Sequence, residues 1–147
     1  PDHDRRFAVI WMMGKRFIRD HRGSLVEAAL TLPLMVLITL GLINLALAGI
    51  AGLHANNAAN YAARRGSVAQ QASASVAASA AWEKLSAVKI GEYGVDVAAS
   101  GGRGGTVNVV VSYRVPNYFA SLASFFGGGA SAFIEGQSIS TFRHEGW

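Results

Sequence analysis

Hydrophobic residues dominate one continuous stretch near the N-terminal end of the chain. From Ala28 to Leu53 the sequence runs 26 residues without a charged side chain. As a helix rising ~1.5 Å per residue this stretch reaches about 39 Å, more than the ~30 Å hydrocarbon core of a bilayer. We therefore predict a transmembrane helix over residues 23–53.

The charges that flank this stretch predict its orientation. Residues 1–22 carry six basic side chains against three acidic ones, and the next basic pair is Arg64 and Arg65. Basic residues stay on the cytoplasmic side of a membrane, so we expect the N-terminus inside and the C-terminal part outside. A cleaved signal peptide ending at Ala46-Leu47-Ala48 is the competing interpretation, although the apolar run exceeds the usual length of such peptides.

Residues 1–22 are predicted to form a basic cytoplasmic segment at the membrane interface. Its apolar part, residues 7–18, is too short to cross a bilayer but can lie flat on one. A patch that binds another subunit is the alternative. The side chains expected at the lipid interface are Trp11, Lys15, Arg16, Arg19 and Arg22.

Three local patterns mark the transmembrane helix itself. Ser24 followed by Glu27 forms a capping-box pattern, which predicts that the helix begins at Ser24. Pro33 should kink it. The last pattern is a face of small and polar residues four apart that would let another helix approach closely. That face consists of Asn44, Ala48 and Gly52.

An alanine-rich stretch, residues 54–90, is expected to extend the same helix outward, with Gly66 as a weak point. Alanine favours helix but buries little surface, so this extension must pack against something larger. We expect one stripe of this extension to contact the C-terminal strands. The stripe consists of Tyr61, Val68, Ala72 and Val76.

The period of the pattern changes to two from Gly91 onward, in residues 91–147. Alternation predicts strands over 95–98 and 106–115, a hairpin loop over 100–105 and a third strand over 131–144. Pro116 should end the second strand, a short apolar helix should cover 118–126, and Gly136 should bulge the third strand. The predicted class is an α+β membrane protein with one long N-terminal helix packed on a small antiparallel sheet of about three strands.

Candidate chemistry adds little to this picture. The chain has no cysteine, and its four histidines lack metal-ligand spacing. The glycines around Arg103 lack the lysine and hydroxyl of a phosphate loop. We therefore expect no catalytic, cofactor or metal site and no enzyme activity. The sequence pI is about 9.9, but the basic excess precedes the apolar run, where it suits anionic lipid better than nucleic acid.

Four segments together resemble one known family. They are RGSLVEAALTLPLM at the start of the apolar run, NNAANYAARRGS after it, the strand VNVVVSYRVP and the terminal SISTFRHE. In this order and spacing they resemble TadE-like proteins, the minor pseudopilins of tight-adherence pili. The resemblance implies cleavage by a prepilin peptidase after Gly23, with Ser24 as the new N-terminus and Glu27 assisting assembly. Glu27 would then be the fourth residue rather than the family's fifth, and Ala28 replaces the aromatic residue that often follows.

Two functional hypotheses follow. In the first, this is a single-pass protein of the bacterial inner membrane that helps to assemble a pilus or secretion apparatus through helix packing and docking. In the second, it keeps the segment before Ser24 and is an accessory structural subunit of a large respiratory or photosynthetic complex. Both make the lipid bilayer and other membrane subunits its partners, and neither involves nucleic acid.

Overall fold

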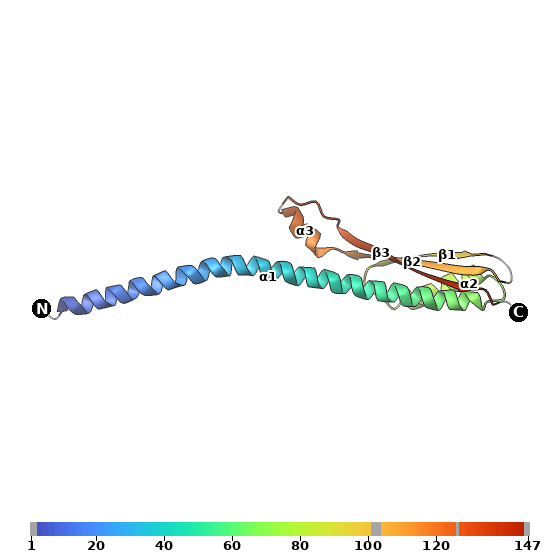
Figure 1. Cartoon of the computed structure of the whole chain (residues 1–147), viewed down its shortest axis with the longest axis horizontal. Coiled ribbons are helices and arrows are strands. Elements are labelled where there is room, and N and C mark those ends of the chain that lie inside the picture. Colours follow the sequence, from blue (N-terminus) through green and yellow to red (C-terminus); the bar gives the residue numbers. More distant parts are fainter. Residues whose placement is uncertain (1–2, 101–103, 126, 146–147) are drawn as a thin grey trace. The chain divides into compact units, whose positions relative to one another are not determined.

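The computed structural model describes residues 3–100, 104–125 and 127–145, with side chains described from Ser24 onward except at 121, 123 and 125. The chain divides into two compact units, Pro1–Leu40 and Gly41–Trp147. Its elements follow the order helix, helix, strand, strand, helix, strand (Figure 1). They are α1 (His3–Ser67), α2 (Ser73–Leu85), β1 (Glu92–Ala99), β2 (Thr106–Pro116), α3 (Tyr118–Phe125) and β3 (Phe133–Arg143). The predicted α+β class, a long N-terminal helix packed on a three-stranded antiparallel sheet, is confirmed.

Helix α1 begins at His3, so the prediction that a helix starts at Ser24 was wrong. Residues 3–23 contain no proline to stop a helix, and Ser24 therefore lies inside α1 rather than at its cap. Within the apolar run, the hydroxyl of Thr31 donates to the carbonyl of Glu27 at 2.7 Å, and that of Thr39 donates to the carbonyl of Met35 at 2.8 Å. These bonds satisfy the two hydroxyls without water.

The alanine-rich extension is not one helix, contrary to prediction. Helix α1 ends at Ser67, one residue after Gly66, and α2 begins at Ser73. Between them Ala72 adopts a left-handed backbone conformation, with φ 53° and ψ 40°. This break shifts the register of the predicted stripe, and Val68 is 59% exposed. Val68 and Ala72 are exposed and lie outside the core, whereas Tyr61 is half-buried and packs against it, so the predicted stripe is right only in part.

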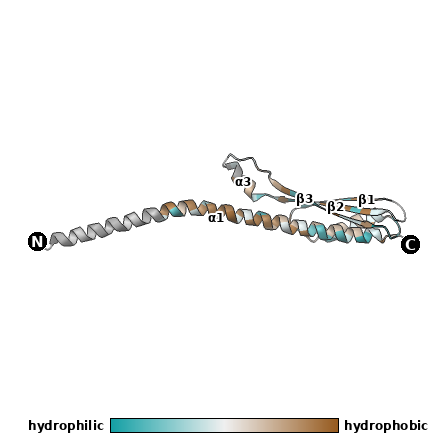
Figure 2. Ribbon diagram, viewed as in Figure 1, coloured by the Kyte–Doolittle hydropathy of each residue, from teal (hydrophilic) through white to brown (hydrophobic). Residues whose placement is uncertain are grey.

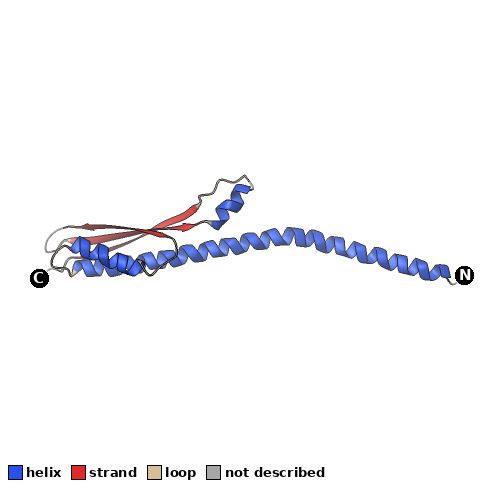
Figure 3. Cartoon of the chain, turned by 180° about the vertical axis from the view of Figure 1, so that it is seen from behind, coloured by secondary structure: helices blue, strands red, loops and turns tan. Residues whose placement is uncertain are grey.

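An alanine face of both helices contacts the sheet. It packs against β2 side chains that alternate along the strand, as the period-2 pattern predicted. Figures 1 and 3 show the end of α1 and α2 running along the sheet. Since alanine leaves little side chain between backbones, helix and strand approach closely, and valines are the largest fully buried side chains. The helical members of this core are Ala55, Ala58, Ala59, Ala62, Ala63, Ala77, Ala80, Ala81 and Leu85, and the strand members are Val107, Val109 and Val111.

The three strands pair in the order β1-β2-β3, both pairs antiparallel. The register between β2 and β3 is continuous through Tyr113 and Gly136, so the predicted bulge at Gly136 was wrong. A Cβ added at Gly136 would collide with the phenol of Tyr113. The glycine therefore leaves room for an aromatic ring of the neighbouring strand. The interruption of the hydrophobic alternation at Gly136 reflects this contact and not a bulge.

Candidate functional site

The most exposed apolar surface of the protein lies along α1. From Ser24 the helix is long and apolar enough to cross a membrane, with a mean hydropathy of 2.4 in its most apolar window, of which 11% is buried. A core helix of a soluble domain would be mostly buried, whereas the large apolar side chains of this helix are exposed. Figure 2 shows this stretch of α1 as the brown part of the ribbon. The large exposed side chains before Gly41 are Leu25, Val26, Leu30, Leu32, Leu34, Met35, Val36 and Ile38.

Asn44 interrupts this apolar surface with a buried polar contact. Its side chain is 6% exposed. Its Nδ2 donates to Oδ1 of Asn117 at 2.7 Å, and its Oδ1 accepts the backbone N–H of Tyr118 at 3.1 Å. Asn117 Oδ1 also accepts the N–H of Phe119 at 3.1 Å, which makes Asn117 the N-terminal cap of α3. Asn44 thereby fastens the first turn of α3 to α1.

Gly52 lies two turns beyond Asn44 on the same face. A Cβ placed on it would stand 3.3 Å from the hydroxyl oxygen of Tyr113, so the absence of a side chain lets the tyrosine lie against α1. Ala48, between them, is half-buried. Within the chain, Asn44 contacts the start of α3 and Gly52 contacts Tyr113 of β2. That this face also packs on a helix of another subunit stays a prediction.

Tyr113 lies opposite Tyr93 in the sheet. The hydroxyl of Tyr93 is buried and has no hydrogen-bond partner among the described residues. Desolvation raises the pKa of this phenol above its ordinary value, because the ionised form loses more hydration. This half-buried tyrosine packs against the core formed by the helices and β2.

The expected processing residues lie within α1. The helix passes through Gly23, and the side chains of Ser24 and Glu27 are exposed. Cleavage after Gly23 stays a prediction. The residues expected at the lipid interface also fall in α1, but their side chains lie outside the described part of the chain: Trp11, Lys15, Arg16, Arg19 and Arg22.

Other candidate groups have local structural roles. Among the described residues no cluster of three potential metal ligands occurs. His144 Nε2 lies 3.0 Å from the carbonyl oxygen of Ala69, which ties the end of β3 to the α1–α2 connection. Tyr61 carries two cations over its ring, with Lys84 Nζ at 4.6 Å and the Arg65 guanidinium carbon at 5.8 Å from the centroid.

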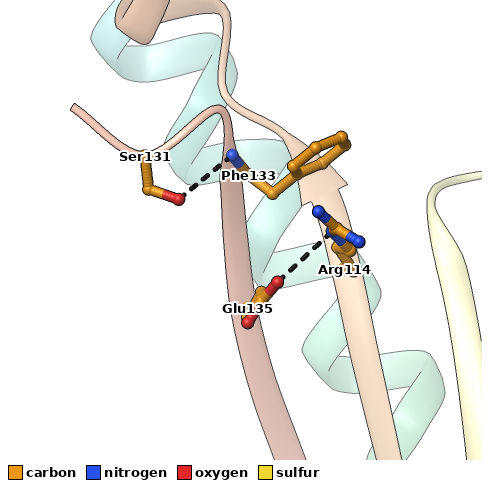
Figure 4. Close-up of polar contacts among 4 residues, drawn as sticks. All are labelled: Arg114, Ser131, Phe133 and Glu135. Carbon is orange, nitrogen blue, oxygen red and sulfur yellow. Dashed lines mark hydrogen bonds and ion pairs between the residues drawn. The ribbon is translucent and has the colours of Figure 1, made fainter. Parts of the chain in front are cut away.

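A charged contact that sequence analysis missed lies where β2 and β3 approach α3. Arg114 Nε is 3.2 Å from a carboxylate oxygen of Glu135, and its guanidinium carbon lies 3.7 Å from the centroid of Phe133 (Figure 4). The opposing positions of Arg114 and Glu135 follow from the β2–β3 register. The position of Asn117 directly after Pro116 was a signal for the cap of α3.

These features define a class: an α+β protein whose described residues include one candidate membrane-spanning helix, with a small folded domain tied to that helix by Asn44. Comparison with family models then gives a closer assignment. Residues 23–64 match the model of the TadE-like protein family, so this segment is TadE-like and the resemblance is confirmed there. The match covers the apolar run and the first part of the alanine-rich extension. The comparisons with curated proteins and with solved structures gave no match.

Proposed function

We propose that this protein is a non-catalytic, single-pass subunit that helps to assemble a tight-adherence pilus or a related secretion apparatus. The observation that carries the proposal is the TadE-like segment 23–64, which coincides with the exposed apolar part of α1 and with the helix that supports the sheet. Such a protein acts by packing its helix among other membrane helices and by docking its folded domain on partner subunits.

Co-purification tests this function. The full chain with a C-terminal affinity tag is expected to bring down pilus membrane subunits from a mild detergent extract, in amounts close to one to one. The same tag on an unrelated single-span protein is the control. Recovery with a respiratory or photosynthetic complex, in place of pilus components, would show that the second hypothesis is right.

We propose further that the protein lies in the bacterial inner membrane with its N-terminus in the cytoplasm. The absence of cysteine allows single-cysteine variants without background labelling. Ser75→Cys, on the exposed side of α2, should react with an impermeant maleimide on spheroplasts. Met13→Cys, combined with Gly23→Leu so that the proposed cleavage does not remove residue 13, should react only after the membrane is permeabilised. The reverse pattern would refute the orientation.

The family match begins at Gly23, the residue after which we propose cleavage. Mass spectrometry of the protein isolated from its own membrane tests this step. A chain that starts at Ser24 supports the pseudopilin function. A chain that retains residues before Gly23 contradicts cleavage and favours an uncleaved accessory subunit. Gly23→Leu is the matched variant, because it should block a glycine-specific peptidase.

A further inference from the structure

A second uncharged stretch, residues 117–134, lies far from α1 in sequence. It contains α3 and extends from just after β2 into the start of β3, with Arg114 as the last charge before it and Glu135 as the first after it. Tyr118 is 49% exposed and Phe119 is 37% exposed. An uncharged helix with exposed aromatic side chains is unusual on a water-facing surface.

The Asn44 contact fixes where this stretch lies along α1. Asn44 is nine residues before Leu53, so the start of α3 meets α1 about 14 Å before the end of the apolar run. Figure 2 shows α3 beside the apolar, brown part of α1, in agreement with that hydrogen bond. The first turn of α3 therefore contacts the apolar run of α1, although the two are remote in sequence.

The length of the apolar run indicates what surrounds α3. A helix crosses a bilayer with about 20 residues. Counted from Ala28, the first residue after Glu27, that number ends at Leu47, which places Asn44 about 5 Å inside the outer edge of the hydrocarbon core. The remaining residues of the run, 48–53, would then extend about 9 Å into the outer headgroup region. Leu53 remains largely exposed there.

We propose that α3 is a lipid-binding element that rests in the outer interface of the bilayer, beside the point where α1 emerges. Tyr118 and Phe119 insert at the boundary between headgroups and acyl chains, a depth that aromatic side chains favour. Asn44 and Asn117 satisfy each other and the first amide groups of α3, which lowers the cost of placing that helix end near lipid.

The charged boundary of the segment agrees with this depth. Arg114 and Glu135 pair with each other at the sheet end of the segment, and the guanidinium group covers Phe133 (Figure 4). The charges nearest to α3 along the chain are thus held on the sheet, where water or headgroups can solvate them. This inference rests on the membrane anchoring in the proposed function and adds a second contact that sets the depth of α1.

Depth measurements with a nitroxide label test the inference. The full chain is reconstituted in vesicles of phosphatidylethanolamine and phosphatidylglycerol, with single cysteines at Phe119, Leu42 or Ser75 in turn. Compared with the label at Ser75 on α2, the label at Phe119 should collide more often with oxygen, which is enriched in lipid. It should collide several-fold less often with a water-soluble nickel chelate. Ala130→Cys, at an exposed position of the same uncharged stretch, provides a second reporter if Phe119→Cys fails to fold.

The label at Leu42 separates this inference from the anchoring itself. If Leu42 and Phe119 both report lipid, the inference is supported. If the label at Leu42 reports lipid while the labels at Phe119 and Ala130 report water, the inference is overturned and the membrane anchoring by α1 is retained. Shielding of Phe119 from water by added pilus subunits would not rescue the inference. If all of them report water, the membrane anchoring is overturned as well.

Discussion

The hydrogen bonds of Asn44 yield the sharpest prediction for the folded unit. Asn44→Ala removes the bond to Asn117 Oδ1, at 2.7 Å, and the acceptor of the Tyr118 N–H, at 3.1 Å. The Asn117 cap on Phe119 stays, so α3 itself can still form. The substitution therefore targets the attachment of α3 to α1.

The expected size of the effect follows from the two bonds. Each contributes about 1 kcal/mol net, which gives about 2 kcal/mol for the attachment. A loss of about 2 kcal/mol raises the equilibrium constant for local opening of the first turn of α3 by roughly 30-fold. The sheet core, which does not include Asn44, should keep its stability.

Amide hydrogen exchange on the protein in detergent micelles measures this opening at the Tyr118 N–H. Asn57→Ala is the matched control, because Asn57 lies on the same helix and is exposed. We expect the variant to lose protection at Tyr118 but not in β2, and the control to change neither. Protection at Tyr118 within about threefold of the parent protein would refute the reasoning, since two weak bonds of about 0.5 kcal/mol each would already change it about fivefold.

Three further predictions concern the sheet and its core. Gly136→Ala should destabilise the domain by about 1–3 kcal/mol in thermal unfolding, because the added methyl group would displace the ring of Tyr113. Gly129→Ala is the control, because its methyl group enters open space and should leave the stability unchanged. Val109→Ala, at a fully buried site, should cost about 2–3 kcal/mol, but exposed Val68→Ala should cost little; equal effects would contradict the described core. Burial raises the pKa of Tyr93 in the folded protein, so above about pH 10 the unfolded chain loses the phenol proton first and the folded state becomes less stable as the pH rises. Tyr93→Phe should reduce this fall of the melting temperature with alkaline pH. An unchanged dependence of the melting temperature on pH would contradict the prediction.

The long apolar helix and the strands could be predicted from the sequence because each carries a strong signal along the chain. The uncharged run sets α1 apart, and the alternating valines of β2 match its buried positions, including Val107 and Val109. Pro116 ends β2 as expected, since proline cannot continue the ladder. These features depend on local composition alone.

The remaining features depend on contacts between distant residues. Gly66 was recognised as a weak point, and α1 ends one residue after it, but a left-handed Ala72 has no sequence signal, because alanine favours helix. The start of a separate helix α2 was therefore not predicted. Asn44 and Gly52 were recognised as a packing face, but their partner could not be identified from spacing. The partners are Asn117 and Tyr113, which the cap of α3 and the antiparallel register of β2 and β3 bring to the helix.

The number of pili on the surface of cells that lack this protein tests the central claim most directly. Electron microscopy should show few or no assembled tight-adherence pili on such cells, and a plasmid copy of the parent chain should restore them. Leu34→Arg, which places a charge in the exposed apolar part of α1, should restore far fewer. Undiminished pili on cells without the protein would contradict a role in pilus assembly.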